Sequence, residues 1–138
     1  MTTDVHPILC LIVDDDADDQ ELFSAAMEKT MLDNYTCIFA GDGAEAIALL
    51  NTAPVPDYIF LDLNMPRLNG LQCLSEIRKQ ERLQEVPVAI YSTSSDELSK
   101  NKALGLGATA FISKPTRFHE LISKLNDFFS AHAPAKKH

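Results

Sequence analysis

The sequence has few basic residues, few cysteines and no long apolar run. Its 12 Lys and Arg residues face 20 Asp and Glu residues, so the formal net charge is 12 − 20 = −8. This argues against a nucleic-acid-binding protein, which needs Lys and Arg to neutralise phosphates. The longest apolar run, residues 8–13, is far shorter than the roughly 20 residues of a membrane-spanning helix. The first residues lack the cationic start and apolar stretch of a secretory signal.

The three cysteines, Cys10, Cys37 and Cys73, are widely spaced and odd in number, and none form a metal-type pair. We interpret them as small apolar core residues in a reducing compartment. A length of 138 residues, with 46% hydrophobic and 23% charged residues, favours one folded domain over a disordered chain. We therefore expect a cytoplasmic, acidic domain that contacts neither membrane nor nucleic acid directly.

Short apolar runs alternate with helical spacing along the chain. A first helix is predicted from Leu22, Phe23, Ala26 and Met27, and a fourth, sparser one from Leu98, Ala103 and Leu104. Five alternations of strand and helix predict an α/β fold with a doubly wound, mostly parallel sheet and helices on both faces. The expected strands are residues 8–13, 35–40, 58–61, 86–91 and 110–112.

Polar side chains follow four of these strands. Asp14 and Asp15 come after the first strand, Asp62 after the third, Ser92 after the fourth and Lys114 near the end of the fifth. In a parallel sheet the carboxyl ends of the strands meet at one rim, where ligands usually bind. The sequence therefore predicts one site made of carboxylates, a hydroxyl and an ammonium.

The charges of this predicted site point to a metal and to phosphoryl transfer. Asp14, Asp15, Asp62 and Lys114 sum to −2, and a divalent cation bound by oxygen ligands, Mg²⁺ above all, restores neutrality. A carboxylate such as Asp62 can itself accept a phosphoryl group. Phosphorylation adds negative charge, so a further donor is recruited, for which Ser92 is the nearest candidate.

With these residues in place, the sequence resembles the receiver domain of bacterial two-component response regulators over roughly residues 8–130. The resemblance implies a CheY-like, flavodoxin-like fold of five strands in the order 2-1-3-4-5 with five helices. It places the acidic pair of the family on Asp14 and Asp15 and the phospho-acceptor on Asp62, within Asp-Leu-Asn-Met-Pro. It also implies that the backbone carbonyl of Asn64 is a metal ligand.

The resemblance further implies a switch made of Ser92 and Phe111, the family's lysine at Lys114, and a cis peptide bond between Lys114 and Pro115. The chain departs from the family pattern at Asn69, where the family more often has Asp, in the dense acidic run from Asp14 to Asp19, and at two positions near the switch. Thr93 replaces a smaller residue beside Ser92, and Phe111 lacks a phenolic hydroxyl, so any signal from it must come from packing.

Three further acids, Asp16, Asp18 and Asp19, are best explained as capping residues of the first helix that complement its dipole. Outside the domain we expect an N-terminal extension over residues 1–7 and a flexible tail over residues 131–138. The short tail leaves no room for an output domain and predicts output through protein contacts.

We therefore predict a single-domain response regulator that takes a phosphoryl group from a histidine kinase or histidine phosphotransfer protein with Mg²⁺. Its downstream protein is unknown. The family's usual contact face, the fourth helix, fifth strand and fifth helix, is expected to bind that protein or to form a homodimer. Lys100, Lys102 and Phe111 belong to this face.

Other functions remain open from the residues alone. The domain could pass its phosphoryl group onward as a phosphorelay intermediate, or act as an unphosphorylated scaffold. A haloacid-dehalogenase-type phosphatase also uses an Asp nucleophile with Mg²⁺, but Asn64 stands where its general acid is needed. In a flavodoxin, Asp14, Asp15 and Asp16 would repel the cofactor phosphate. We therefore expect a signalling domain, not an enzyme that turns over an external substrate.

Overall fold

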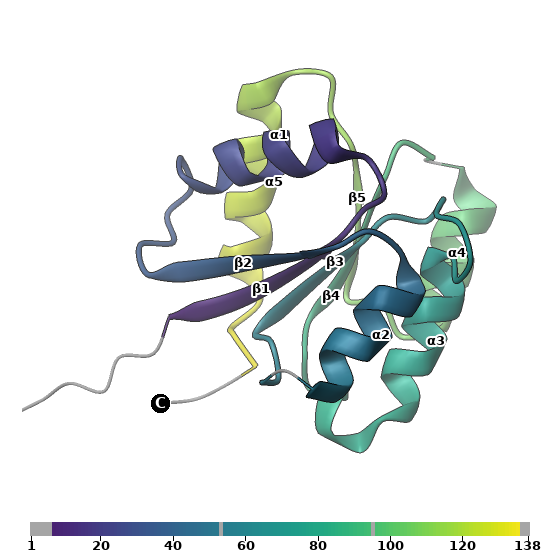
Figure 1. Cartoon of the computed structure of the whole chain (residues 1–138). Coiled ribbons are helices and arrows are strands. Elements are labelled where there is room, and N and C mark those ends of the chain that lie inside the picture. Colours follow the sequence, from purple (N-terminus) through teal and green to yellow (C-terminus); the bar gives the residue numbers. More distant parts are fainter. Residues whose placement is uncertain (1–6, 53, 95, 136–138) are drawn as a thin grey trace, which may run out of the picture.

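The computed structural model describes residues 7–52, 54–94 and 96–135, and most of the predicted N-terminal extension and the last three residues of the predicted tail lie outside these ranges. Strands and helices alternate along the chain (Figure 1). The elements are β1 (Ile8–Val13), α1 (Ala17–Met27), β2 (Tyr35–Ala40), α2 (Gly43–Thr52), β3 (Tyr58–Leu61), α3 (Gly70–Lys79), a 3-10 turn η1 (Glu81–Leu83), β4 (Val88–Ser92), α4 (Glu97–Gly105), β5 (Ala110–Ser113) and α5 (Phe118–Ala131).

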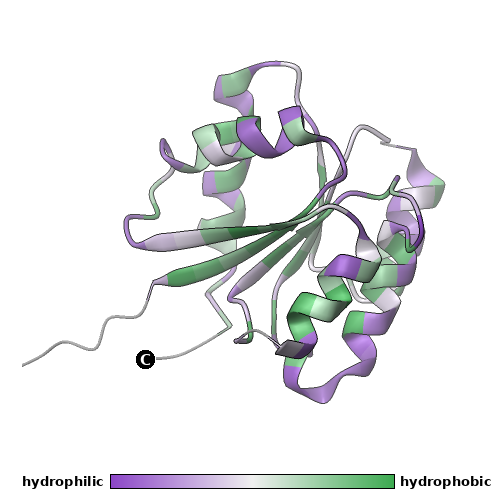
Figure 2. Cartoon of the chain, viewed as in Figure 1, coloured by the Kyte–Doolittle hydropathy of each residue, from purple (hydrophilic) through white to green (hydrophobic). Residues whose placement is uncertain are grey.

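The five strands form one parallel sheet in the order β2-β1-β3-β4-β5, as predicted. Helices α1 and α5 cover one face, and α2, α3 and α4 cover the other (Figure 1). Alternate residues of one strand enter opposite cores: Leu11 and Val13 pack on the side of α2 and α3, whereas Cys10 and Ile12 pack on the side of α1 and α5. Burial on both faces explains why the central strands are continuously apolar (Figure 2).

The predicted bounds of β1, β2 and β3 are confirmed. Strand β4 begins at Val88 instead of residue 86, and β4 and β5 each extend one residue beyond the predicted ends, to Ser92 and Ser113. Pro87 has no backbone N–H to donate and contributes only its carbonyl, which accepts from the Ile59 amide at 3.0 Å. The Val86 amide turns back to the Leu83 carbonyl at 3.2 Å. The ladder of β4 therefore starts only after the proline.

Parts of the predicted helical stripes are wrong. Leu22 in α1 is 43% exposed, and in α4 Leu98 and Leu104 are 66% and 43% exposed. In α4 only Ala103 of the predicted stripe is buried. The start of this nine-residue helix is stabilised by Asp96, whose side chain caps α4 by accepting from the Ser99 amide at 2.8 Å.

Residues after α5 return to the end of the sheet opposite the predicted site. The Tyr58 hydroxyl donates to the His132 carbonyl at 2.7 Å, and the Ala135 amide donates to the Asp57 carbonyl at 3.3 Å. Among the described residues, no helix has both the length and the apolarity required to span a membrane.

Candidate functional site

The carboxyl end of β1 places Asp14 in the interior of the site. The Asp14 amide continues the sheet by donating to the Ala40 carbonyl at 3.0 Å, and its side chain is almost fully buried. Its Oδ1 accepts from the Asp16 amide at 2.9 Å, and its carbonyl accepts from Gln20 Nε2 at 2.7 Å. The backbone thus fixes both the position and the orientation of this carboxylate.

Asp62 occupies the equivalent position after β3. Its amide donates to the Val13 carbonyl at 2.9 Å, so β1 and β3 hold Asp14 and Asp62 side by side. Only 8% of Asp62 is exposed, and its Oδ1 accepts from the Asn64 amide at 3.3 Å. The strand-end prediction for these two residues is confirmed as a matter of position.

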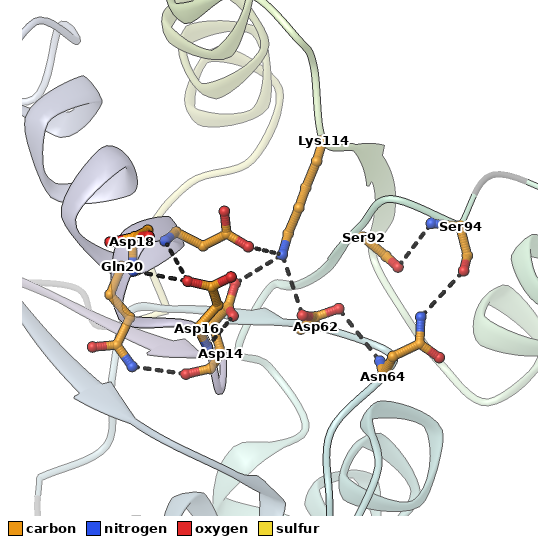
Figure 3. A network of polar contacts seen from close by, with 10 residues as sticks. Asp14, Asp16, Asp18, Gln20, Asp62, Asn64, Ser92, Ser94 and Lys114 are labelled. Carbon is orange, nitrogen blue, oxygen red and sulfur yellow. Dashed lines mark hydrogen bonds and ion pairs between the residues drawn. The ribbon is translucent and has the colours of Figure 1, made fainter.

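Lys114 reaches this pair from the end of β5 (Figure 3). Its Nζ lies 2.9 Å from Asp14 Oδ2 and 3.2 Å from Asp62 Oδ2, and its backbone amide donates to the Ser92 carbonyl at 2.8 Å. The ammonium also lies 5.1 Å from the ring centroid of Tyr91, which fits a cation–π contact. One ammonium therefore binds carboxylates that follow two other strands.

Sequence reasoning missed a third carboxylate on this ammonium. Asp19 Oδ2 lies 2.8 Å from Lys114 Nζ. Asp16 caps α1 as predicted, because its side chain accepts from the Asp18 and Asp19 amides at 2.8 and 3.3 Å. Asp18 is exposed in the same first turn. Asp19 thus belongs to the site, and the signal that could have found it is its position in the turn that follows Asp14.

The electrostatics of the site are those of crowded, partly dehydrated acids. Burial raises the pKa of Asp14, and its bonds to Lys114 and the Asp16 amide offset this only in part. Burial by itself lowers the pKa of Lys114, but the hydrogen bonds that its ammonium donates to Asp19 and Asp14 outweigh this effect, and the pKa is raised. Lys114 therefore stays charged at neutral pH and cannot act as a base there.

The acid cluster fits a divalent cation. Asp14, Asp15 and Asp62 each offer a carboxylate oxygen, and these oxygens lie within 4.8 Å of one another. Asp15 is exposed, so the cluster opens to solvent on its side. With Asp19, the four carboxylates and one ammonium sum to −4 + 1 = −3, and hard oxygen donors of this kind suit Mg²⁺ or Mn²⁺.

Hydroxyl and amide groups line the rim beside Asp62 (Figure 3). Ser92 is fully buried at the end of β4, and its Oγ accepts from the Ser94 amide at 3.1 Å. The Asn64 side chain donates from Nδ2 to Ser94 Oγ at 3.2 Å, so the loops after β3 and β4 are joined. Ser92 therefore lies at the rim as predicted, with its oxygen bound to its own loop.

Two expectations from the resemblance concern β5. Phe111 is half-buried and packs against the core on the side of α2 to α4, which is compatible with both a packing and a switching role. The predicted cis bond before Pro115 is wrong, because the described residues contain no cis peptide bond. Trans is the lower-energy isomer of an X–Pro bond, and Lys114 reaches all three carboxylates with it.

Comparisons with known proteins agree with this geometry. The sequence profile described as "Response regulator receiver domain" matches residues 10–126. The transcriptional regulatory protein CpxR of Klebsiella pneumoniae is 33% identical over 115 residues, which are 83% of this chain and 46% of that protein. The response regulator Rcp1 of Synechocystis is 28% identical over 121 residues and is covered to 82% of its length. The chain thus spans about half of the CpxR proteins that it matches.

Solved structures give the same result. The Mn²⁺-bound form of Rcp1 superposes with a TM-score of 0.79 at 27% identity, covering 90% of this chain and 93% of that one. A phosphorylated cyanobacterial phytochrome response regulator, RcpA, superposes with a TM-score of 0.84 at 26% identity, covering 96% and 98% of the two chains. By sequence profile and fold together, this chain belongs to the receiver domains of two-component response regulators.

Proposed function

We propose that Asp62 accepts a phosphoryl group from a histidine kinase or a histidine phosphotransfer protein, and that its phosphorylation changes a protein-binding surface. The observation that carries this proposal is the convergence of the Asp62 carboxylate with Asp14, Asp15 and the Lys114 ammonium at one rim. Family membership, the Mn²⁺-bound Rcp1 structure and the phosphorylated RcpA structure support it.

Asp62 and Lys114 have different roles in the proposed transfer. An Asp62 oxygen forms the new bond to phosphorus while the bond between phosphorus and the donor nitrogen breaks, which leaves the donor histidine neutral. Phosphoryl transfer depends on positioning and on cations near the phosphoryl oxygens more than on a general base. Lys114, held by Asp14 and Asp19 at 2.9 and 2.8 Å, is a cation already in place for this purpose.

A divalent cation offsets most of the negative charge of the site. We assign Mg²⁺ to the carboxylates of Asp14, Asp15 and Asp62 and to the backbone carbonyl of Asn64. The cation supplies charge neutralisation for the acids and for the incoming phosphoryl oxygens. Without it, the net charge of −3 that these acids share with Asp19 and Lys114 repels an anionic donor.

We expect the Ser92 hydroxyl to respond to phosphorylation of Asp62. Its oxygen accepts from the Ser94 amide, and a hydroxyl that accepts in this way retains a hydrogen to donate. A phosphoryl oxygen on Asp62 is a strong acceptor for that hydrogen. Movement of Ser92 toward it would pull on the loop after β4 and on the Asn64–Ser94 contact, and we propose that Phe111 and the α4–β5–α5 face respond to this change.

A hydrolytic phosphatase is the alternative with the same nucleophile. It requires a general acid two residues after Asp62, and that position is Asn64, whose side-chain amide donates to Ser94 Oγ at 3.2 Å. An amide does not supply a proton to a leaving group as a carboxylic acid does. The signalling function, with an onward phosphorelay as a variant of it, is therefore the function we propose.

Acetyl phosphate with Mg²⁺ tests the proposal. The chain should gain about 80 Da, the mass of one phosphoryl group, and omission of Mg²⁺ should suppress the gain. Asp62→Asn should carry no adduct, whereas Asp33→Asn, which removes an exposed acid after α1, should be phosphorylated like the native chain. An adduct of undiminished yield on Asp62→Asn would show that another residue is the acceptor.

A further inference from the structure

The sheet brings two of the three cysteines together. Strands β1 and β2 are neighbours in the sheet (Figure 1). Cys10 of β1 and Cys37 of β2 are partners in their parallel register, so they lie opposite each other. Both belong to the core on the side of α1 and α5, and all three cysteines are free thiols. Each thiol shifts the pKa of the other. Twenty-six residues separate them in the sequence, which is why spacing alone did not reveal the pair.

The two thiols differ in access to solvent. Cys10 is fully buried on an inner strand, whereas Cys37 is half-buried on β2, the outer strand of the sheet. The neighbouring Cys10 thiol lowers the pKa of Cys37, and the Cys37 thiol together with burial raises the pKa of Cys10. Cys37 therefore has the properties of an attacking thiolate, and Cys10 those of a resolving thiol.

We propose that Cys10 and Cys37 are a redox site, at which a peroxide converts the two thiols into a reversible disulfide within the chain. The Cys37 thiol loses its proton, its thiolate attacks one oxygen of hydrogen peroxide and the O–O bond breaks, so that a sulfenic acid forms and the departing hydroxide takes up that proton as one water. The Cys10 sulfur then attacks the Cys37 sulfur, the S–O bond breaks, and the hydroxide leaves with the Cys10 proton as a second water. Two thiols are oxidised and one peroxide is reduced.

The strand spacing is compatible with this bond. Neighbouring strands lie about 4.7–4.9 Å apart, and the α-carbons of a disulfide lie roughly 4.4–6.8 Å apart. The register therefore places the two cysteines within the range that a disulfide spans. Because Cys37 is half-buried on the outer strand, a reductant can reach the bond, which is typical of reversible disulfides. The segment that it closes includes α1 and the acidic residues Asp14 to Asp19.

Cys73 provides a matched control within the chain. It is buried in α3, in the core on the opposite face of the sheet, and burial raises its pKa to about 12. Cys73 is thus a buried thiol on the other side of the sheet from Cys10 and Cys37. If oxidation depended only on the presence of buried cysteines, Cys73 would react as Cys10 does.

The experiment treats the folded chain with hydrogen peroxide, then alkylates it under denaturing conditions and measures its mass. We expect two of the three thiols to escape alkylation, a loss of about 2 Da for the two hydrogens removed, and reversal by dithiothreitol. A peptide map should join the segments that contain Cys10 and Cys37. Cys73→Ala should still form the bridge, and Cys37→Ala should keep both remaining thiols reduced.

Three outcomes would overturn the proposal: three reactive thiols after oxidation, a bridge that includes Cys73, or a Cys37 disulfide between two chains without the internal one. The peptide map of the native chain decides among them without any variant. Circular dichroism of Cys37→Ala, whose substitution lies on the outer strand, checks that its lack of a bridge does not come from unfolding.

Discussion

Lys114 is the residue on which the site converges, because its ammonium binds three carboxylates at 2.8–3.2 Å. The native arrangement divides one positive charge among Asp14, Asp19 and Asp62. If Asp62 is the phospho-acceptor, Asp19 competes with it for the ammonium. Asp19 therefore sets how much of that charge is available to an incoming phosphoryl group.

Asp19→Asn should accelerate phosphorylation by acetyl phosphate about two- to fivefold. The substitution lowers the net charge of the site from −3 to −2 and frees Lys114 for the anionic donor, which corresponds to about 0.5–1 kcal/mol of the barrier. Initial rates from intact-mass time courses measure the change. Asp18→Asn makes the same change of charge at an exposed neighbour, and an equal acceleration there would show that contact with Lys114 is not the cause.

Single residues were predictable where the backbone alone determines their position. Asp14 and Asp62 directly follow strands, so their place at the rim follows from the topology. Asp19 lies one helical turn further on, where its direction depends on how α1 begins. Sequence reasoning assigned it to the helix dipole, because the register between α1 and Lys114 is a tertiary feature.

Among the elements, α3 packs closely against the loop after β3. The Gly70 amide donates to the Leu63 carbonyl at 3.0 Å, and a β-carbon on Gly70 would collide with the Asp62 carbonyl oxygen. Asn69 caps the helix through its bond from the Gln72 amide at 2.9 Å. The start of α3 is thus in close contact with the backbone of the segment that carries Asp62.

Gly70→Ala should destabilise the domain by about 1–3 kcal/mol, because the backbone around Asp62 has to shift to admit the methyl group. Urea unfolding measures this loss, and slower phosphorylation by acetyl phosphate should accompany it. Gly105→Ala is the matched control, since a β-carbon there meets open space at the end of α4. Equal losses in the two variants would mean that contact with Asp62 is not responsible.

Helix α2 is tied to the same loop by Asp42. Its side chain caps α2 by accepting from the Glu45 amide at 2.8 Å, and it pairs with Arg67, whose φ of 65° lies in the left-handed region. The Glu45 amide and then the Arg67 guanidinium lower the pKa of Asp42 from its usual 3.8. Its stabilising contribution is therefore complete above pH 3.8 and disappears as the pH falls through the lowered value.

Asp42→Asn should reduce the dependence of stability on pH below about pH 4 and should lower the stability at pH 7, because asparagine keeps the cap but loses the charge facing Arg67. Urea midpoints from pH 2 to 7 measure the profile. Asp33→Asn makes the same change of net charge at an exposed position. A profile for Asp42→Asn that runs parallel to the native one would contradict the role of the ion pair.

Elements were predictable where one pattern dominates. The bounds of the first three strands were predicted correctly, whereas Pro87 moves the start of β4, and β4 and β5 each extend one residue further than predicted. The stripes of α1 and α4 were partly wrong, because Leu22, Leu98 and Leu104 are exposed. Short amphipathic patterns do not show which face meets the sheet, and packing decides it.

At the scale of the whole molecule, the sheet order was predictable from the family resemblance, and the meeting of the two cysteines was not. Strand alternation limits the topology to few choices, but the pairing of Cys10 with Cys37 depends on the register between β1 and β2. The same register brings Asp14 beside the carbonyl of Ala40. Long-range register thus positions both the acid site and the thiol pair.

The free energy of unfolding of the whole domain should depend on a divalent cation. Without the cation, substitution of the buried Asp14 and of the exposed Asp15 should have different effects. In EDTA, Asp14→Asn should raise the free energy of unfolding by on the order of 1 kcal/mol, since it removes a buried charge from a site with excess negative charge. Asp15→Asn should change it little, because Asp15 is exposed.

With Mg²⁺ at tenfold its dissociation constant, the native domain should gain about 1.4 kcal/mol of unfolding free energy, and both variants should gain less. Urea titrations with and without Mg²⁺ measure all three proteins, and a full gain in both variants would show that the cation binds elsewhere.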